Sequence, residues 1–437
     1  MVFLYLRDSE SCHRQYLKDI TEVCRSWRIA ALANRRLWSR ILISLQGYPL
    51  PAVYKRCKSR LHCYLERSVT APLSIEITLD ADYWPPCDET AMARVRSLIA
   101  LVSQEISRWE SLSIDLEDEE GLDKWTRRAW EDEPITLLTS FLSSPMPSLR
   151  RLSLCGVRDY FENFLPEIPS LDTFEIKGGD TSELYIPWSS LTSFRHSSSQ
   201  YSSDSRHLSH LSECTRLKDL YIEGIELSEN KLGEAFSCTL PDVVSFHLHS
   251  LPTREPINII LADFRLPSLQ NLTLIVPHAF WDRSGDSPGP PYMMMAKMST
   301  AEHIACFAGT CKVLTLLWSQ TTPNRSSSRV SVQFSTSVII DMFNAMPDLE
   351  ELRVSKEISE VFLKVIKEEE PLVPKLSRVC ILDTGGWQRD EARKPKQPTS
   401  WSELASSGNM NHPLYPILAL RRDLGLRSGP GFGLHMF

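Results

Sequence analysis

The chain has 437 residues, of which 42% are hydrophobic and 24% are charged, and this composition excludes a wholly disordered protein. Its formal net charge of −7 argues against a general phosphate-backbone binder, because such proteins usually carry a basic surplus. Glycine is scarce, at 17 residues, whereas nucleotide-binding enzymes need glycine where the backbone approaches phosphate.

An amphipathic helix is predicted near the N-terminus. Its apolar positions recur at helical spacing and form one stripe: Ile20, Val23, Cys24, Trp27 and Ala31. The pair Leu37-Trp38 follows after a short break. We interpret residues 1–48 as a small helical module in which this stripe packs into a core.

For residues 49–80 we predict a linker helix followed by a first strand. The apolar positions of the helix again fall near helical spacing: Val53, Cys57, Leu61 and Leu65. The basic residues of the run Lys55 to Arg60 then occupy the solvated side of this helix. Tyrosines flank the basic run, so nucleic-acid binding is an alternative, which strongly salt-dependent retention of DNA or RNA would support.

A repeat fills much of residues 81–383. An apolar residue and a proline precede the pattern Leu-x-x-Φ-x-Φ, in which Φ is apolar, as in Met146 to Leu154. The apolar-proline pair recurs at Ile168-Pro169, Leu240-Pro241, Leu266-Pro267, Met346-Pro347 and Val373-Pro374. Relaxed copies follow Ile186-Pro187 and begin at Leu217, and a degenerate early copy begins at Trp109.

The spacing of these copies indicates the fold. Leading apolar residues at positions 149, 171, 191, 217, 243 and 269 are separated by 20 to 26 residues. Repeats of that length with this pattern are typical of leucine-rich-repeat solenoids. We therefore predict an α/β fold: a leucine-rich-repeat-like solenoid of stacked parallel strands with helices outside. Helical periodicity before Trp109 and before Met346 supports the outer helices.

The Φ-x-Φ alternation also predicts a binding face. Both apolar side chains point to one side of the strand, so the residue between them points away from the core. These intervening positions are Arg195, Tyr221, His247, Thr273 and Arg353. Stacked strands place them on one face of the sheet, the surface that such arrays use for binding.

Residues 384–437 predict a polar linker and a C-terminal capping region. The segment from His412 to Arg422 has the character of a short helix that closes the array, and terminal repeats need such a cover. We expect the last residues, from Gly429, to be a frayed tail.

Catalytic and metal-binding patterns are not found. The sequence contains no Gly-x-Ser-x-Gly, P-loop, Gly-x-Gly-x-x-Gly or His-Glu-x-x-His motif. Two groups of cysteine and histidine, at residues 57–63 and 303–311, have neither paired Cys-x-x-Cys spacing nor a fourth ligand. We expect no enzyme activity, no metal and no cofactor.

Cysteine usage and the absence of targeting segments predict the compartment. The 11 cysteines are an odd number with no Cys-x-x-Cys pair, so free thiols in a reducing compartment are the simplest interpretation. The apolar run Met1 to Leu6 is too short for a signal peptide, and no window reaches the roughly 18 apolar residues of a membrane span. We expect a cytoplasmic or nuclear protein without a membrane partner.

Two segments resemble a known family. The run Val23-Cys24-Arg25-Ser26-Trp27-Arg28 followed by Leu37-Trp38 resembles the second half of an F-box. Leu65-Glu66-Arg67-Ser68 with Pro72-Leu73-Ser74-Ile75 resembles the segment that follows the F-box in F-box proteins of mushroom-forming fungi. In that family a degenerate leucine-rich array follows, as it does here.

The resemblance implies a function. F-box proteins are substrate receptors of SCF-type cullin–RING ubiquitin ligases: the F-box docks on the SCF adaptor and the repeats hold a protein target. Carried over, the adaptor-binding F-box core is Ile20, Val23, Cys24, Trp27, Leu37 and Trp38. The Leu-Pro-x-Glu opening of a full F-box is absent from the sequence, so a repeat scaffold without ligase docking stays open as the alternative.

Overall fold

The computed structural model describes the chain in segments, which are residues 24–45, 51–80, 89–117, 144–155, 168–177, 186–197, 206–223, 238–249, 264–277, 309–319, 336–368, 373–382 and 433–436. The chain divides into two compact units, Met1–Arg216 and Leu217–Phe437. This division falls inside residues 81–383, the range in which we predicted the solenoid.

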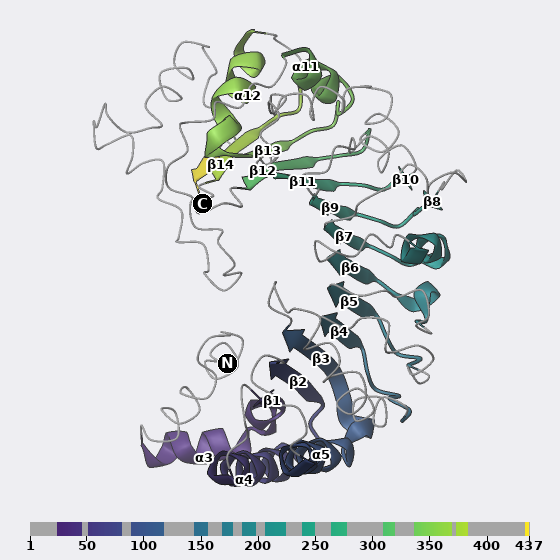
Figure 1. Ribbon diagram of the computed structural model, residues 1–437. Helices are drawn as coiled ribbons and strands as arrows, with labels where there is room; N and C mark the ends of the chain where they lie inside the picture. The colour runs from purple at the N-terminus through teal and green to yellow at the C-terminus, as the bar shows by residue number, and fades with distance from the viewer. Residues whose placement is uncertain are drawn as a thin grey trace, which may run out of the picture. The chain divides into compact units, whose positions relative to one another are not determined.

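The first unit is a parallel sheet with helices at its N-terminal end (Figure 1). Its strands follow the chain order and are β1 (Arg40–Leu45), β2 (Leu73–Asp80), β3 (Trp109–Glu117), β4 (Arg151–Cys155), β5 (Thr173–Lys177) and β6 (Ser193–Ser197). Its helices are α3 (Arg25–Ala33), α4 (Pro51–Ser68) and α5 (Glu89–Ser103), with the 3-10 turns η2 (Arg35–Trp38), η4 (Ile106–Arg108), η6 (Trp188–Ser190) and η7 (Arg206–Glu213).

The second unit is also a parallel sheet accompanied by helices. Its sheet runs in the order β7 (Asp219–Glu223), β9 (Ser245–His249), β11 (Asn271–Pro277), β12 (Val313–Ser319), β13 (Glu351–Ser355), β14 (Arg378–Leu382) and β15 (Gly433–Met436). The neighbouring strands of this order pair in parallel. Two short strands, β8 (Cys238–Thr239) and β10 (Phe264–Arg265), form a separate parallel pair, and the helices are α11 (Thr336–Asn344) and α12 (Lys356–Glu368).

The apolar residues of the repeat are stacked in register, as the spacing predicted. Leu152 pairs with Phe174 and Phe174 pairs with Phe194 in the first unit, and all three are fully buried. Leu220, Phe246, Leu272, Leu314 and Leu352 make the same row in the second unit. Burial of each such side chain contributes roughly 1.5–3 kcal/mol, so every repeat stabilises its neighbours. The parallel, solenoid-like α/β arrangement is therefore confirmed.

The repeated proline lies at the second position of a tight turn that enters the strand. The N–H of Leu149 donates to the carbonyl of Met146 at 3.2 Å, and Leu171 donates in the same way to Ile168. Proline favours that turn position because its fixed φ matches the required backbone conformation.

Each turn is tied to the next repeat by its backbone. The carbonyl of Asp172 accepts the N–H groups of Thr192 and Ser193 at 2.8 and 3.1 Å, and the carbonyl of Arg150 accepts those of Asp172 and Thr173. The same arrangement recurs through the second unit at Lys218, Val244, Gln270, Lys312 and Glu350. Backbone hydrogen bonds thus fix the register whatever the side chains of the turn.

One repeat escaped the sequence analysis. Strand β12 follows Cys311, which is fully buried at the position where other copies have leucine, and no proline precedes it. Leu314 and Leu316 then complete the usual alternation. The long step between positions 269 and 349 therefore contains a full repeat whose leading residue is a cysteine.

Helical predictions before two of the repeats are confirmed. Helix α5 buries Val95, Leu98, Ile99 and Val102, and α11 buries Ile339, Met342 and Phe343. Helix α12, which the sequence analysis did not identify, packs Phe362 edge-to-face against Phe343 at 6.1 Å. The linker helix expected between residues 49 and 80 is α4, followed by β2.

Two boundary predictions were wrong. Residues 40–45 fall in the module that we expected to be helical, but they form strand β1, whose Ile41 and Ile43 are buried and pair with Ile75 and Ile77 of β2. Residues 433–436 fall in the expected tail, but they form strand β15 against β14. Residues 433–436 alternate apolar and other residues, which is the strand period, whereas residues 40–45 contain the apolar run Ile41-Leu42-Ile43, of which Leu42 is exposed. The expected helix at 412–422 lies outside the described residues.

Candidate docking surface

Helix α3 begins at a sulfur cap and buries very little. The N–H of Trp27 donates to Cys24 Sγ at 3.5 Å, so Cys24 takes the place of the usual oxygen cap. Ala31 is the buried residue of this helix. A nine-residue helix is marginal in water by itself, so α3 depends on its contacts with the rest of the unit.

Trp38 of η2 anchors α3 to α4. Its indole Nε1 donates to the carbonyl of Ala31 at 2.9 Å. Its ring meets Tyr64 of α4 edge-to-face at 5.4 Å, and the Arg67 guanidinium lies 4.3 Å from the ring centroid. Together with buried Leu37, these contacts fix the position of α3 on the C-terminal half of α4.

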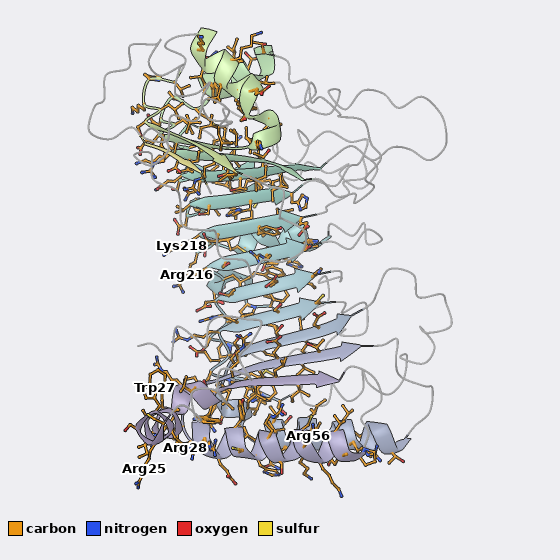
Figure 2. All side chains as sticks on the ribbon, turned by 90° about the vertical axis from the view of Figure 1, so that its left-hand side faces the viewer. Arg25, Trp27, Arg28, Arg56, Arg216 and Lys218 are labelled. Carbon is orange, nitrogen blue, oxygen red and sulfur yellow. The ribbon has the colours of Figure 1, made fainter. Side chains whose placement is uncertain are left out.

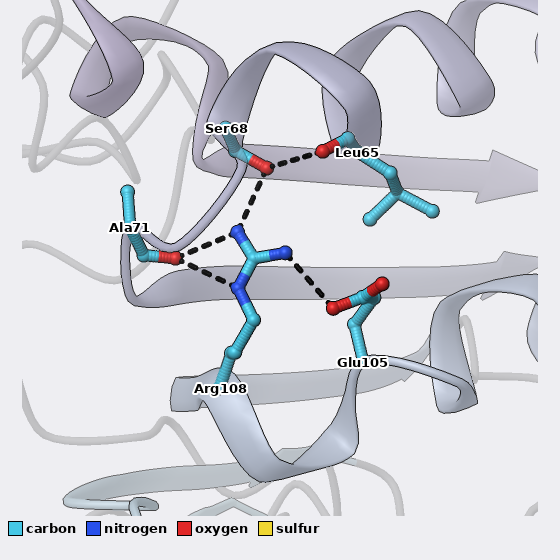
Figure 3. A network of polar contacts seen from close by, with 5 residues as sticks. All are labelled: Leu65, Ser68, Ala71, Glu105 and Arg108. Atoms are coloured by element: carbon cyan, nitrogen blue, oxygen red, sulfur yellow. Dashed lines mark hydrogen bonds and ion pairs between the residues drawn. The ribbon is translucent and has the colours of Figure 1, made fainter.

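The C-terminus of α4 is held by an arginine of the following repeat. Arg108 donates from Nε and Nη2 to the carbonyl of Ala71 at 3.2 and 2.8 Å, and from Nη2 to Ser68 Oγ at 3.0 Å (Figure 3). Its Nη1 lies 2.9 Å from Glu105 Oε2. Ser68 is the last residue of α4 and Ala71 follows three residues later, so Arg108 joins the end of α4 to the turn that precedes β3.

The outward side of α3 combines cations with exposed apolar side chains. Arg25, Arg28, Ile29 and Leu32 recur at the spacing of one helix face, and we call these four residues the α3 face. Ile29 is 59% exposed and Leu32 is 39% exposed. The sequence analysis missed Ile29 and Leu32, because it followed the other stripe, although their spacing with the two arginines was a sufficient signal.

The residues that the resemblance assigned to the F-box core have different environments. Leu37 and Trp38 are buried together, whereas Cys24 is exposed and Trp27 is 40% exposed. The expectation that Cys24 and Trp27 pack into a core was therefore wrong: along this stripe α3 is backed by a single small residue, Ala31. Ile20 and Val23 lie outside the described residues.

The predicted sheet-face residues occupy the positions expected for them. In the second unit Tyr221 pairs with His247, and His247 pairs with Thr273. Thr315 pairs with Thr273 on one side and with Arg353 on the other. Thr315 was missed because its repeat was missed. Each of the four predicted residues of this unit is half-buried between two buried neighbours. Arg195 belongs to the first unit, where it pairs with Glu175 across a 3.6 Å ion pair.

Polar contacts cross-link the second unit's sheet face. The Tyr221 hydroxyl donates to Glu223 Oε2 at 3.0 Å, and Glu223 Oε1 lies 2.8 Å from His249 Nδ1. The Tyr221 and His247 rings lie 6.0 Å apart. These side chains are held in place before any ligand arrives, which lowers the entropic cost of binding.

A second polar group surrounds Glu351. Its Oε1 lies 2.7 Å from Arg353 Nε, and its Oε2 lies 3.3 Å from Arg378 Nη1. Burial by itself would raise the pKa of Glu351, but the hydrogen bond from Arg353 and the charges of both arginines outweigh it and hold the pKa below its ordinary value of 4.5. Arg353 is therefore partly neutralised on the face where we predicted it.

Within the described residues, no group of three or more histidine, cysteine, aspartate or glutamate residues is arranged to bind a metal. Burial, together with Asp115, raises the pKa of the Cys155 thiol to about 12, so this cysteine is a poor nucleophile. None of the helices in these segments is both long enough and apolar enough to cross a bilayer.

Comparisons with known proteins assign no family to this chain. No family model matches this chain, and no curated protein matches it. A solved structure, the crystal structure of a Bacteroides fragilis protein from a structural genomics programme, is 14% identical, covers 75% of this chain and 76% of its own, and has a TM-score of 0.28. A similarity at that TM-score carries no argument about this chain.

Proposed function

We propose that the protein is a non-catalytic substrate receptor, in which the α3 face docks the adaptor of an SCF-type ubiquitin ligase and a leucine-rich-repeat-like sheet face holds a protein target. The observation that carries the proposal is that Ile29 and Leu32 of α3 are exposed. Ala31 is the buried residue of this helix. Exposed apolar side chains on one helix face mark a protein interaction site.

The anchoring of α3 supports the same proposal. Trp38 and Arg67 hold the helix on α4, and Arg108 holds α4 on the sheet. A docking helix on this support would hold the bound adaptor at a fixed place on the first unit.

Target binding is assigned to the outward face of the sheet. The row Tyr221, His247, Thr273 and Arg353 offers an aromatic ring, an imidazole, a hydroxyl and a guanidinium along β7, β9, β11 and β13, with Thr315 of β12 between the last two. Such a mixture suits a folded or extended protein segment with its own polar groups.

The cysteines support a particular compartment. Cys24, Cys214 and Cys311 form no disulfide bond, which favours placement in a reducing compartment, the cytoplasm or nucleus.

Co-purification with the SCF adaptor tests the proposal. The full chain is expected to recover the adaptor, and the double substitution Ile29→Asp with Leu32→Asp is expected to abolish recovery without lowering the melting temperature, because both side chains are exposed. Leu42→Asp is the matched control, since Leu42 of β1 is 41% exposed in the same unit. A folded wild-type chain that recovers no adaptor would leave the alternative, a repeat scaffold without ligase docking.

A further inference from the structure

The N-terminal part of the first unit is strongly basic in an acidic protein. Residues 23–65 contain nine of the chain's 48 lysines and arginines and none of its 55 aspartates and glutamates. The remaining 39 cations and 55 anions leave the rest of the chain at −16. This basic segment comprises α3, η2, β1 and most of α4.

Part of this charge forms a stripe along α4. Arg56, Arg60 and Arg67 lie at i, i+4 and i+11, which places them on one side of the helix. Arg56 and Arg60 are exposed and have no ion-pair partner within the described ranges. Their separation along the axis is about 6 Å, at about 1.5 Å per residue.

The stripe starts where α3 is anchored. Arg67 lies over the Trp38 ring, and Trp38 donates to the backbone of α3. Figure 2 shows Arg25 and Arg28 on α3 and Arg56 on α4 at the same end of the first unit. A partner seated on the α3 face therefore has the arginine stripe of α4 next to it.

We propose that the adaptor surface extends beyond the α3 face along α4, and that an acidic region of the adaptor pairs with Arg56 and Arg60. This inference rests on the proposed function. Charge complementarity steers encounter and suppresses wrong partners, and Arg56 and Arg60 have no carboxylate partner in the described part of the chain.

The observations favour an acidic protein over a nucleic acid. Phosphate binding needs no apolar contact, whereas Ile29 and Leu32 are exposed beside the cations. A nucleic acid is also a long polyanion, and beyond residues 23–65 it would meet a chain with a charge of −16. A compact protein can present carboxylates to the basic end alone.

The test measures association of the purified adaptor with the full chain at 50 and 500 mM NaCl. Arg56→Glu with Arg60→Glu is expected to slow association about tenfold at 50 mM salt, and less at 500 mM, with little change in the dissociation rate. Lys356→Glu with Lys367→Glu on α12 is the charge-matched control and is expected to bind like wild type. Arg56→Gln with Arg60→Gln gives a smaller effect of the same kind, and replaces the reversal if that variant does not fold.

The outcomes separate the two proposals. Adaptor binding that is equal for wild type and the double reversal, at both salt concentrations, overturns the acidic-partner inference and leaves adaptor docking intact. A folded wild-type chain that does not bind the adaptor overturns both. Tighter binding of a 20-base-pair DNA duplex than of the adaptor, lost in the double reversal, also overturns the inference, because the stripe would then serve nucleic acid.

Discussion

The helical end of the first unit and its strand repeats use apolar residues in opposite ways. Strands β4 to β6 direct their alternating apolar side chains into one core, and Leu152, Phe174 and Phe194 are fully buried. Helix α3 instead leaves Ile29 and Leu32 exposed and buries Ala31 alone. The comparison teaches that the repeats complete their own core, while α3 is positioned by its neighbours and leaves two apolar side chains exposed.

The largest predicted effect contrasts one aromatic residue from each region. Phe174→Ala removes a ring that contacts Phe194 at 5.9 Å and Trp188 at 6.1 Å, and we expect a loss of about 3–5 kcal/mol in unfolding free energy. Trp27→Ala should cost less than about 1 kcal/mol, because Trp27 is partly solvated. Urea denaturation of both variants measures the difference. Equal losses would contradict the contrast.

A smaller effect is expected at the joint between the two regions. Arg108→Met removes the donors to Ala71 and Ser68, and should cost roughly 2–3 kcal/mol, since hydrogen bonds from charged groups are the stronger ones. Arg150→Met, at an exposed position before β4, is the control and should be nearly neutral. Hydrogen exchange of the last turn of α4 should accelerate only in the Arg108 variant. Unchanged exchange there would exclude Arg108 as the support of α4.

The end of α4 also contains a strained residue. Val69 has φ 47°, a left-handed conformation that a β-branched residue rarely adopts, and its N–H donates to Leu65 at 3.3 Å. Val69→Gly should raise the unfolding free energy by about 1 kcal/mol, because glycine adopts this conformation without the Cβ clash. Val69→Ala keeps the Cβ and should gain much less. A gain of similar size in both variants would refute strain as the cause.

The smallest predicted effect is a pH dependence in the second unit. The folded pKa of Glu351 lies below its ordinary value, so its carboxylate stabilises the fold above pH 4.5, and this stabilisation is lost as the pH falls through the folded pKa. Glu351→Gln should cost less than about 1 kcal/mol at pH 7, because both arginine partners are partly exposed. Melting between pH 3 and 7 should show a flatter acid limb in the variant. An identical acid limb would be evidence against this role.

The repeats were predictable from sequence because their physics is local and periodic. A two-residue alternation after a turn proline specifies a strand and its buried side, and the recurrence specifies stacking. The prediction failed at Cys311, where a buried thiol replaces leucine and no proline precedes, and at residues 40–45 and 433–436, where strands add to the sheet outside the recognised period. Pairing of distant segments is not encoded in local pattern.

The candidate docking surface was less predictable. The sequence identified the segment and the pair Leu37-Trp38, which is buried against α4. It did not show which residues of α3 are covered, since periodicity reveals which residues share a face but not which face is buried. Only the contacts of Trp38 with Ala31, Tyr64 and Arg67 show how the helix is seated.

Hydrogen exchange of α3 with and without the SCF adaptor tests the central claim most directly. In the free chain the amides of residues 25–33 should exchange quickly, because this short helix has little buried surface. A saturating concentration of adaptor should slow them at least about tenfold, while the amides of β4 to β6 stay unchanged. Exchange in α3 that is the same with and without adaptor, in a folded chain, would contradict docking at the α3 face.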